Sequence, residues 1–381
     1  MIYLDNSATT FPKPQRVRET AANAMMNSAN PGRSGHSLSL RASEEIFRAR
    51  KTAAALFNAR SESDVVFTLN CTAAINTVLK GILKSGDNVV VSSLEHNAVM
   101  RPLEAMKSSG ITWTEARVYP LDNDRTVDSF RRSINSRTSM IVCTHASNVW
   151  GIKLPIERLA ALAHEYGLLI AVDTAQSAGV VPIDIQDSRV DFLCAAGHKG
   201  LYGPMGTGML IINGSTVPEP LFEGGTGSNS LSFDQPEELP DRLESGTPNV
   251  SGIAGLRAGM EFVMQNKPEN IAGHEFMLIK RLYRGLSGMK GIELYLPEPD
   301  PRYTVPILSF NFEGADSETA ASMLNRRGIA VRAGLHCSPM AHKMAGTLER
   351  GAVRISPSVF TRASDIDRTL SAISMVRKEL N

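Results

Sequence analysis

Short apolar runs alternate with amphipathic stretches along the first half of the chain, which predicts strands alternating with helices. Strands are expected at residues 65–69, 88–93, 111–118, 139–144, 168–172, 190–195 and 208–212. Helices are expected near residues 14–27, 39–57, 73–83, 98–108, 126–134 and 155–166. Continuous apolar strands are typical of a mostly parallel sheet covered on both faces. Because no helix is expected between the last two strands, one of them is predicted to run antiparallel.

The second half of the chain departs from this alternation. Residues 213–250 are rich in proline and glycine, and such an irregular insert is usually functional or interfacial. A helix over residues 251–265 is predicted to lead into a smaller α+β unit. Within that unit, strands are expected near 292–296, 304–311, 329–333 and 352–355, and helices near 269–287, 317–327 and 364–379. We therefore expect a large domain over residues 14–250 and a small domain formed by residues 1–13 and 251–381.

Composition narrows the function classes. The 381 residues are 42% hydrophobic, which is enough for a sizeable core. Forty basic and 39 acidic side chains give a net charge of +1, so nucleic acid is not expected as a partner. The start of the chain lacks the pattern of a signal peptide, and no apolar run reaches the ~18 residues of a membrane helix. Four cysteines without metal-type spacing predict free thiols, no metal site and a cytoplasmic location.

The stretch after the strand expected at 190–195 carries the first candidate catalytic group. His198 and Lys199 follow Gly197, and glycines recur at positions 200, 203, 206 and 208. Glycines allow a flat ligand to approach the backbone, and open α/β sheets bind ligands just past their strand ends. Burial among small groups would lower the lysine pKa from ~10.4 and favour the neutral amine that condenses with an aldehyde. A surface lysine on a glycine-rich turn is the alternative interpretation of Lys199 alone.

Two further strand ends carry groups suited to a ring-shaped ligand. Asp173 ends the apolar run 168–172, where a carboxylate could keep a pyridine nitrogen protonated; a helix N-cap is the alternative. Gln176, three residues later, could donate a hydrogen bond to a phenolic oxygen of the same ring. His96 follows the strand expected at 88–93, where its imidazole could stack on the ring, or serve only as a loop histidine.

The remaining candidates suit anionic groups. Thr72 lies where a strand meets a helix, a junction that binds anions, although an N-cap explains it equally well. Asn148 lies in another strand-end loop, where it could donate to a substrate carboxylate or to a cofactor phenolate, or simply form a turn.

One cysteine differs from the others. Cys337 lies in a loop of glycine, serine and proline, beside a histidine and near Arg332. Positive neighbours lower a thiol pKa, which indicates a reactive group, whereas Cys143 and Cys194 lie in apolar runs and are predicted to be inert. Arg332 and Arg354 are candidates for binding a carboxylate, with surface ion pairs as the alternative.

Together these residues resemble the class V aminotransferase family, in its cysteine desulfurase and selenocysteine lyase branch. The motifs that carry the resemblance lie at residues 3–10, 95–97, 147–148, 172–176, 197–199, 202–204, 246–249 and 332–337. The resemblance implies the aspartate aminotransferase type of fold, with about seven mostly parallel strands in the large domain. It also implies the cofactor pyridoxal 5'-phosphate (PLP) and a homodimer with shared active sites.

The resemblance also implies a role for each matching position. Lys199 would hold the cofactor covalently and move protons. The cofactor ring would be held by Asp173, Gln176 and His96, and its phosphate by Thr72, Ala73, His198 and the partner subunit's Thr247. The substrate would be bound by Asn148, Arg354, Arg332, His36 and Ala8. The family often has a serine where this chain has Ala196, and an acidic residue where it has Ala73, so phosphate binding is expected to rely on Thr72, His198 and backbone groups.

The implied reaction converts L-cysteine to L-alanine, with Cys337 attacking the substrate sulfur and carrying it as a persulfide. The short loop around Cys337 gives the thiol little reach, so a separate sulfur-acceptor protein is expected to approach it. Two alternatives stay open from the sequence. One is a selenocysteine lyase acting on L-selenocysteine, a C–S lyase or another class V enzyme in which Cys337 is not essential. The other is a non-catalytic scaffold that has kept the fold.

Overall fold

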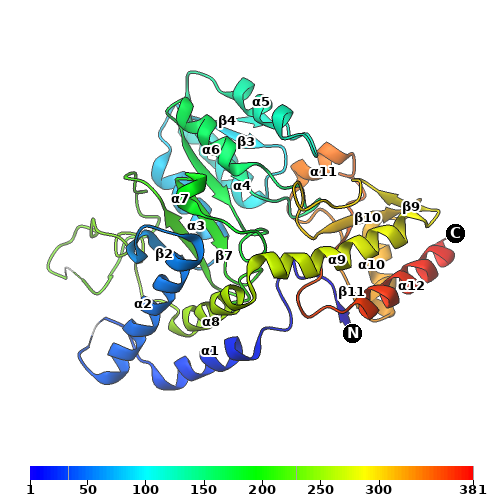
Figure 1. The fold of residues 1–381 in the computed structure, drawn as a ribbon. Coiled ribbons are helices and arrows are strands. Elements are labelled where there is room, and N and C mark those ends of the chain that lie inside the picture. Colours follow the sequence, from blue (N-terminus) through cyan, green and yellow to red (C-terminus); the bar gives the residue numbers. More distant parts are fainter. Residues whose placement is uncertain (33, 229, 381) are drawn as a thin grey trace.

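A seven-stranded sheet forms the centre of the larger part of the molecule (Figure 1). The computed structural model describes residues 1–32, 34–228 and 230–380, so positions 33, 229 and 381 of the predicted domains lie outside it. The strand order is β2-β8-β7-β6-β5-β3-β4. The strands are β2 (Val65–Thr68), β3 (Asn88–Ser92), β4 (Thr112–Ala116), β5 (Thr138–Thr144), β6 (Leu169–Asp173), β7 (Phe192–Ala196) and β8 (Gly208–Ile212). All seven predicted strands are confirmed, and β8 runs antiparallel to both of its neighbours, as one of the last two strands was expected to.

Alternate residues of each strand enter two separate cores, one on each face of the sheet. Val90 and Ile141 pack with helices α2 (Ser37–Phe57), α5 (Asn123–Ser133) and α6 (Ile156–Glu165). Val89, Val91, Met140 and Val142 pack on the opposite face with α3 (Cys71–Ile82) and α4 (Asn97–Met106). Because successive side chains of a strand point to opposite faces, a sheet covered on both sides needs apolar residues at every position. The continuous apolar runs in the sequence have this physical origin.

A layer of helices joins the sheet to the rest of the chain. Helix α1 (Gln15–Asn27) and α2 both pack against α8 (Val250–Asn266), and α9 (Pro268–Ser287) leads onward (Figure 1). The short helix α7 (Ile185–Ser188) was not predicted. The described residues between 213 and 249 contain neither helix nor strand, which confirms the irregular insert.

The smaller unit is built on two small sheets. Strands β9 (Ile292–Leu294), β10 (Leu308–Phe312) and β12 (Val353–Ile355) form an antiparallel sheet, and β1 (Ile2–Tyr3) pairs in parallel with β11 (Ile329–Ala330). Their core includes residues of α9, α10 (Ser317–Arg326) and α12 (Ala363–Leu380). Helix α11 (Pro339–Ala345) was not predicted. The chain termini lie on the same side of the molecule (Figure 1).

Three strand predictions in this unit were too long, and the one over 292–296 ends at Leu294. The strand predicted over 304–311 begins only at Leu308, because Pro306 has no N–H to donate to a neighbouring strand. The strand predicted over 329–333 ends at Ala330, after which only an isolated bridge between Arg332 and Arg354 continues the pairing. The division into two domains at residues 14 and 251 stays a prediction.

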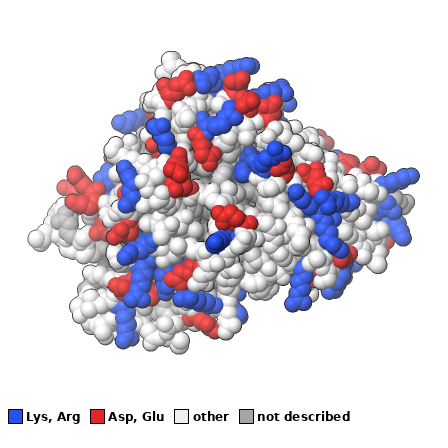
Figure 2. Space-filling view, viewed as in Figure 1, with Lys and Arg blue, Asp and Glu red and all other residues white. Residues whose placement is uncertain are grey.

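The surface has no dominant sign of charge on the face shown in Figure 2, where basic and acidic side chains are interspersed. This pattern agrees with the net charge of +1. None of the described helices combines the length and apolar character needed to cross a membrane.

Candidate active site

The carboxyl ends of the parallel strands surround a cavity of about 240 Å³. Because these strands end at the same edge of the sheet, residues far apart in the sequence meet there. Eight residues predicted to belong to a site line this cavity: Ala8, Thr72, His96, Asn148, Asp173, Gln176, His198 and Lys199. Cys71 and Ala196 also line it, and Cys71 was not among the predicted site residues.

Lys199 follows β7 and is mostly buried. Burial lowers its pKa from 10.5, while the nearby Asp173 carboxylate opposes that shift. Glycine at position 200 is required by the packing around this turn, since a Cβ there would lie 2.4 Å from the Ala178 carbonyl oxygen. The structure therefore presents an amine with a lowered pKa on a glycine-lined turn, as predicted from the sequence.

An N-terminal strap, residues 5–13, fixes the backbone beside Lys199. The His198 carbonyl oxygen accepts hydrogen bonds from the Thr10 amide at 3.2 Å, the Thr9 hydroxyl at 3.1 Å and Lys13 Nζ at 2.7 Å. The Thr10 hydroxyl also donates to the Lys199 carbonyl oxygen at 3.1 Å. The strap thus limits the movement of the backbone that carries the amine.

Asp173 ends β6 and is 5% exposed. Its Oδ1 accepts a hydrogen bond from the Ala175 amide at 2.9 Å and lies 3.3 Å from Cys71 Sγ. No described helix begins here, so the N-cap interpretation is wrong and the carboxylate faces the cavity instead. The thiol at position 71 could have been suspected only from its place directly before Thr72.

The tautomer of His96 follows from its role as the N-cap of α4. Its Nδ1 accepts a hydrogen bond from the Ala98 amide at 3.0 Å, so the ring proton of the neutral form lies on Nε2. Burial lowers the pKa of His96, which favours this neutral form. Gln176, which also lines the cavity, donates from Nε2 to the Ser7 carbonyl oxygen at 3.1 Å.

The start of α3 and His198 suit a bound phosphate. Asn70 caps the helix by accepting from the Ala73 amide at 2.9 Å, so Thr72 is not the N-cap. The positive end of the helix dipole attracts anions at this position. His198 Nδ1 is buried without a partner among the described residues, and burial lowers the pKa of His198 to about 4. Ala73 lines a neighbouring pocket and not this cavity.

Arg354 lies on β12 and is 2% exposed. It donates to the Asn148 carbonyl oxygen and to Asp5 Oδ1, each at 2.8 Å, while its Nε is buried without a partner in the described part of the chain. Arg332 pairs with Arg354 through the backbone, and neither arginine is among the residues that line the cavity. Asp5 was not predicted as a site residue.

Cys337 is exposed, whereas the other three cysteines are buried, which agrees with the predicted contrast between Cys337 and the core thiols. The loop that carries it touches the cavity wall, because Asn97 N–H donates to the Cys337 carbonyl oxygen at 2.8 Å and Asn148 Nδ2 donates to the His336 carbonyl oxygen at 2.7 Å. One expectation needs correction. Burial lowers the pKa of His336 to about 2, so this ring is neutral and brings no positive charge to the thiol.

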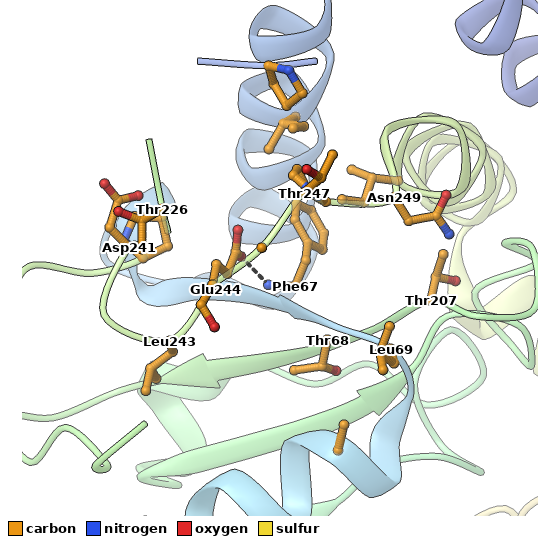
Figure 3. Close-up of a pocket in the computed structure, with 18 of the residues that line it drawn as sticks. Phe67, Thr68, Leu69, Thr207, Thr226, Asp241, Leu243, Glu244, Thr247 and Asn249 are labelled. Carbon is orange, nitrogen blue, oxygen red and sulfur yellow. Dashed lines mark hydrogen bonds between the residues drawn. The ribbon is translucent and has the colours of Figure 1, made fainter. Parts of the chain in front are cut away.

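Two further predicted residues also lie outside the cavity. His36 is exposed and caps α2, with Nδ1 accepting from the Ser39 amide at 3.2 Å. Thr247 lines a second pocket of about 510 Å³, between β2, α2 and the insert (Figure 3). There Glu244 accepts from the Phe67 amide and pairs with Arg50. Within one chain, neither His36 nor Thr247 is brought to the Lys199 cavity.

Comparison with known proteins agrees with this geometry. The family model described as aminotransferase class-V matches residues 2–369. The chain belongs to the class-V aminotransferase family. Within this family, a probable cysteine desulfurase of Synechocystis is 32% identical over 98% of this chain and 90% of its own length. A probable cysteine desulfurase of Methanothermobacter thermautotrophicus is 33% identical over 96% of this chain and 92% of its own.

Solved structures of family members share the fold. The apo structure of cysteine desulfurase from Thermococcus onnurineus has a TM-score of 0.90 at 30% identity, over 99% of this chain and 95% of that one. The cysteine desulfurase CsdA (S-sulfonic acid) from Escherichia coli has a TM-score of 0.89 at 28% identity, over 100% and 95% of the two chains. The expected fold class is therefore confirmed.

Proposed function

We propose that this protein is a PLP-dependent cysteine desulfurase that converts L-cysteine to L-alanine and carries the sulfur as a persulfide on Cys337. The observation that carries the proposal is the cavity shared by Lys199, Asp173 and His96, whose wall is hydrogen-bonded to the Cys337 loop. Full-length similarity to cysteine desulfurases of the same family supports it.

The residues around the cavity fit PLP. The unpartnered Nδ1 of His198 and the start of α3 suit a phosphate, and the Asp173 carboxylate suits a protonated ring nitrogen. Gln176 and His96 would contact the ring, and Lys199 would hold the cofactor covalently. When bound, PLP withdraws electrons from the α-carbon of an amino acid.

The chain's own groups would then move protons and bind the substrate. Lys199 Nζ, whose neutral form is favoured by burial, would take the α-proton and return it. Arg354 is suited to the substrate carboxylate because its buried Nε still lacks a partner in the described structure. Asn148, whose carbonyl oxygen accepts from Arg354, lines the cavity and would provide a second donor.

The sulfur transfer balances without an external oxidant. The Cys337 sulfur bonds to the substrate sulfur while the carbon–sulfur bond of the substrate breaks. The substrate carbon receives a proton and becomes the methyl group of L-alanine. The two sulfurs are oxidised to the persulfide level as that carbon is reduced, so Cys337–SH and L-cysteine yield Cys337–S–SH and L-alanine.

Product analysis tests this proposal. The purified protein with PLP, L-cysteine and a thiol reductant is expected to release equal amounts of alanine and sulfide. Cys337→Ala should lower this turnover by about 100-fold or more, because a nucleophile is removed. Cys143→Ala is the matched control, since this buried thiol lies on the face of β5 away from the cavity wall and should retain turnover. Unchanged alanine formation by Cys337→Ala would contradict the persulfide role, and pyruvate in place of alanine would indicate a C–S lyase.

A second measurement addresses the cofactor. Lys199→Ala is expected to abolish the visible absorption of covalently bound PLP in the purified protein. Arg368→Ala, an exposed residue of α12, is the control and should keep the absorption. Retention of the band in Lys199→Ala would contradict the assigned role of this lysine.

We further propose a homodimer in which Thr247 of each subunit reaches the cofactor phosphate of the other. Support comes from the position of Thr247 outside its own chain's cavity and from the large exposed apolar residues Leu69 and Phe222, which line the same pocket as Thr247. Light scattering with size exclusion should give twice the chain mass of 41.2 kDa, and a monomer would contradict this arrangement. A separate sulfur-acceptor protein and a cytoplasmic location stay predictions, tested by persulfide transfer to candidate acceptors and by cell fractionation.

A further inference from the structure

The backbone of the Cys337 loop adopts a conformation that must be held in place. His336 has a φ of 52° and Cys337 a φ of 57°, so two consecutive residues with side chains lie in the left-handed region. Residues other than glycine rarely adopt this region, and such conformations persist only where surrounding contacts impose them. The contacts around the loop therefore decide where the thiol lies.

One set of contacts passes through the side chain of Asn148. Ser338, which is 0% exposed, donates from Oγ to Asn148 Oδ1 at 2.6 Å, and Asn148 Nδ2 donates to the His336 carbonyl oxygen at 2.7 Å. A carbonyl oxygen can only accept, so the atom facing His336 must be the amide nitrogen. The Ser338 hydroxyl then supplies the one donor that the amide oxygen needs.

The same amide also borders the cavity, where Asn148 is one of the lining residues. Its Nδ2 carries two protons, and the His336 carbonyl oxygen uses only one of them. With both ends of the amide engaged, its plane is fixed, and so is the direction of the second proton. The position of the loop and the donor offered to a ligand in the cavity are therefore set by one side chain.

A second set of contacts around the loop involves two histidine rings. The His336 ring stacks on His342 with an interplanar angle of 5°, and His342 Nδ1 lies 2.8 Å from the Thr347 hydroxyl. These contacts fix the His336 side chain but leave the backbone at Ser338 untouched. Asn148 and Ser338 therefore add a side-chain hydrogen bond to the backbone hydrogen bonds of this segment, among them the one from the Asn97 N–H to the Cys337 carbonyl oxygen.

We propose that Ser338 is a positioning residue, which through Asn148 sets both the place of the Cys337 thiol and the grip on the substrate carboxylate. This inference rests on the proposed desulfurase function. Loss of the Ser338 hydroxyl would remove the donor that holds Asn148 Oδ1 in this part-buried contact, so the amide and the loop would rearrange together. A residue with a purely structural role would not change substrate affinity and loop motion in concert.

The test compares Ser338→Ala with Ser338→Thr, which keeps a hydroxyl, and with Ser188→Ala. Ser188 is a buried serine of α7 whose hydroxyl donates to the Ile185 carbonyl oxygen at 3.3 Å, away from the cavity. The first readout is hydrogen exchange of the loop amides, among them the Ser338 N–H that donates to the Leu335 carbonyl oxygen at 2.9 Å. Exchange should accelerate about tenfold in Ser338→Ala and remain unchanged in the other two variants.

The second readout is the exchange of the α-proton of L-alanine with solvent deuterium, followed by NMR on the PLP-loaded enzyme. This reaction uses the carboxylate site but not the thiol. Ser338→Ala should raise KM about fivefold with kcat within about twofold, because only binding through Asn148 is weakened. Formation of the Cys337 persulfide from L-cysteine, measured by mass spectrometry in a single turnover, should slow by about tenfold.

The outcomes separate this inference from the function it rests on. If Ser338→Ala leaves either the loop exchange or the KM for L-alanine unchanged, the positioning role is overturned. If Ser338→Thr behaves like Ser338→Ala, the hydroxyl is not the decisive group and the role is likewise overturned. Failure of the proposed function would instead appear as unchanged L-alanine formation from L-cysteine in Cys337→Ala.

Discussion

Glu275 offers a quantitative test of how burial shapes this protein. The residue lies on α9, is 5% exposed and faces Tyr202. Burial raises its pKa from 4.5 to about 8, so the carboxyl group is mainly protonated in the folded protein at pH 7 and ionised in the unfolded chain. Because the folded state then binds more protons than the unfolded state, the free energy of unfolding must fall as the pH rises from about 4.5 to about 8.

The size of the effect follows from the two pKa values. A difference of about 3.5 between them corresponds to about 5 kcal/mol, which is the upper bound reached only above pH 8. Burial of the Glu275 carboxyl group therefore lowers the free energy of unfolding by less than about 1 kcal/mol at pH 5 and by about 4 kcal/mol at pH 8. Glutamine keeps the shape of the protonated carboxyl group but cannot ionise. Glu275→Gln should therefore stabilise the protein by about 3 kcal/mol more at pH 8 than at pH 5.

Urea unfolding of the wild type and of Glu275→Gln at several values between pH 5 and pH 8 measures this difference. Glu349→Gln is the matched control, since it makes the same exchange at an exposed position. A stability difference between Glu275→Gln and the wild type that stays constant over this pH range would refute the argument from burial.

Three further variants probe other contacts. Asp5→Ala should lower the free energy of unfolding by about 3 kcal/mol, since it removes the carboxylate that pairs with the buried Arg354 at 2.8 Å; a loss below about 1 kcal/mol in urea unfolding would contradict this. Gly179→Ala should lower the free energy of unfolding by about 2 kcal/mol or more. It should also weaken the binding of PLP, which equilibrium dialysis measures. Gly179 has a φ of +85°, and an added Cβ would lie 2.2 Å from the Gly200 carbonyl oxygen beside Lys199; normal stability would show that this turn adapts. Burial raises the pKa of Glu95 from 4.5 to about 8, so Glu95→Gln should stabilise the protein by about 3 kcal/mol more at pH 9 than at pH 6; equal effects at both pH values would count against it.

Prediction from the sequence worked best where a local pattern has one physical cause. A sheet covered on both faces requires apolar residues at every strand position, and all seven runs proved to be strands. It worked less well in the smaller unit, where strands are short. There Pro306 delayed the start of β10, and the pairing after Ala330 reduced to a single bridge.

The candidate site shows the same contrast between local features, which were predictable, and contacts between distant segments, which were not. Lys199, Asp173 and His96 were predictable because strand ends of an open sheet meet at one edge, so each group could be placed without knowing its partners. The charge state of His336 was not predictable, because it depends on burial by residues remote in the sequence. Asp5 and Cys71 were missed for a related reason, since each acts through a partner, Arg354 or Asp173, more than 100 positions away.

The amino-acid sequence alone determined the order of the elements, the covered sheet and the chemical groups at its edge, because periodicity and strand-end position are local properties of the chain. Only the tertiary structure decided which of these groups share a cavity and which are neutral. It also decided which predicted residues lie outside the cavity of their own chain, as His36 and Thr247 do. Hydrogen bonding and desolvation depend on distances between segments that the sequence does not contain. The link from Ser338 through Asn148 to the Cys337 loop belongs to this second kind of information.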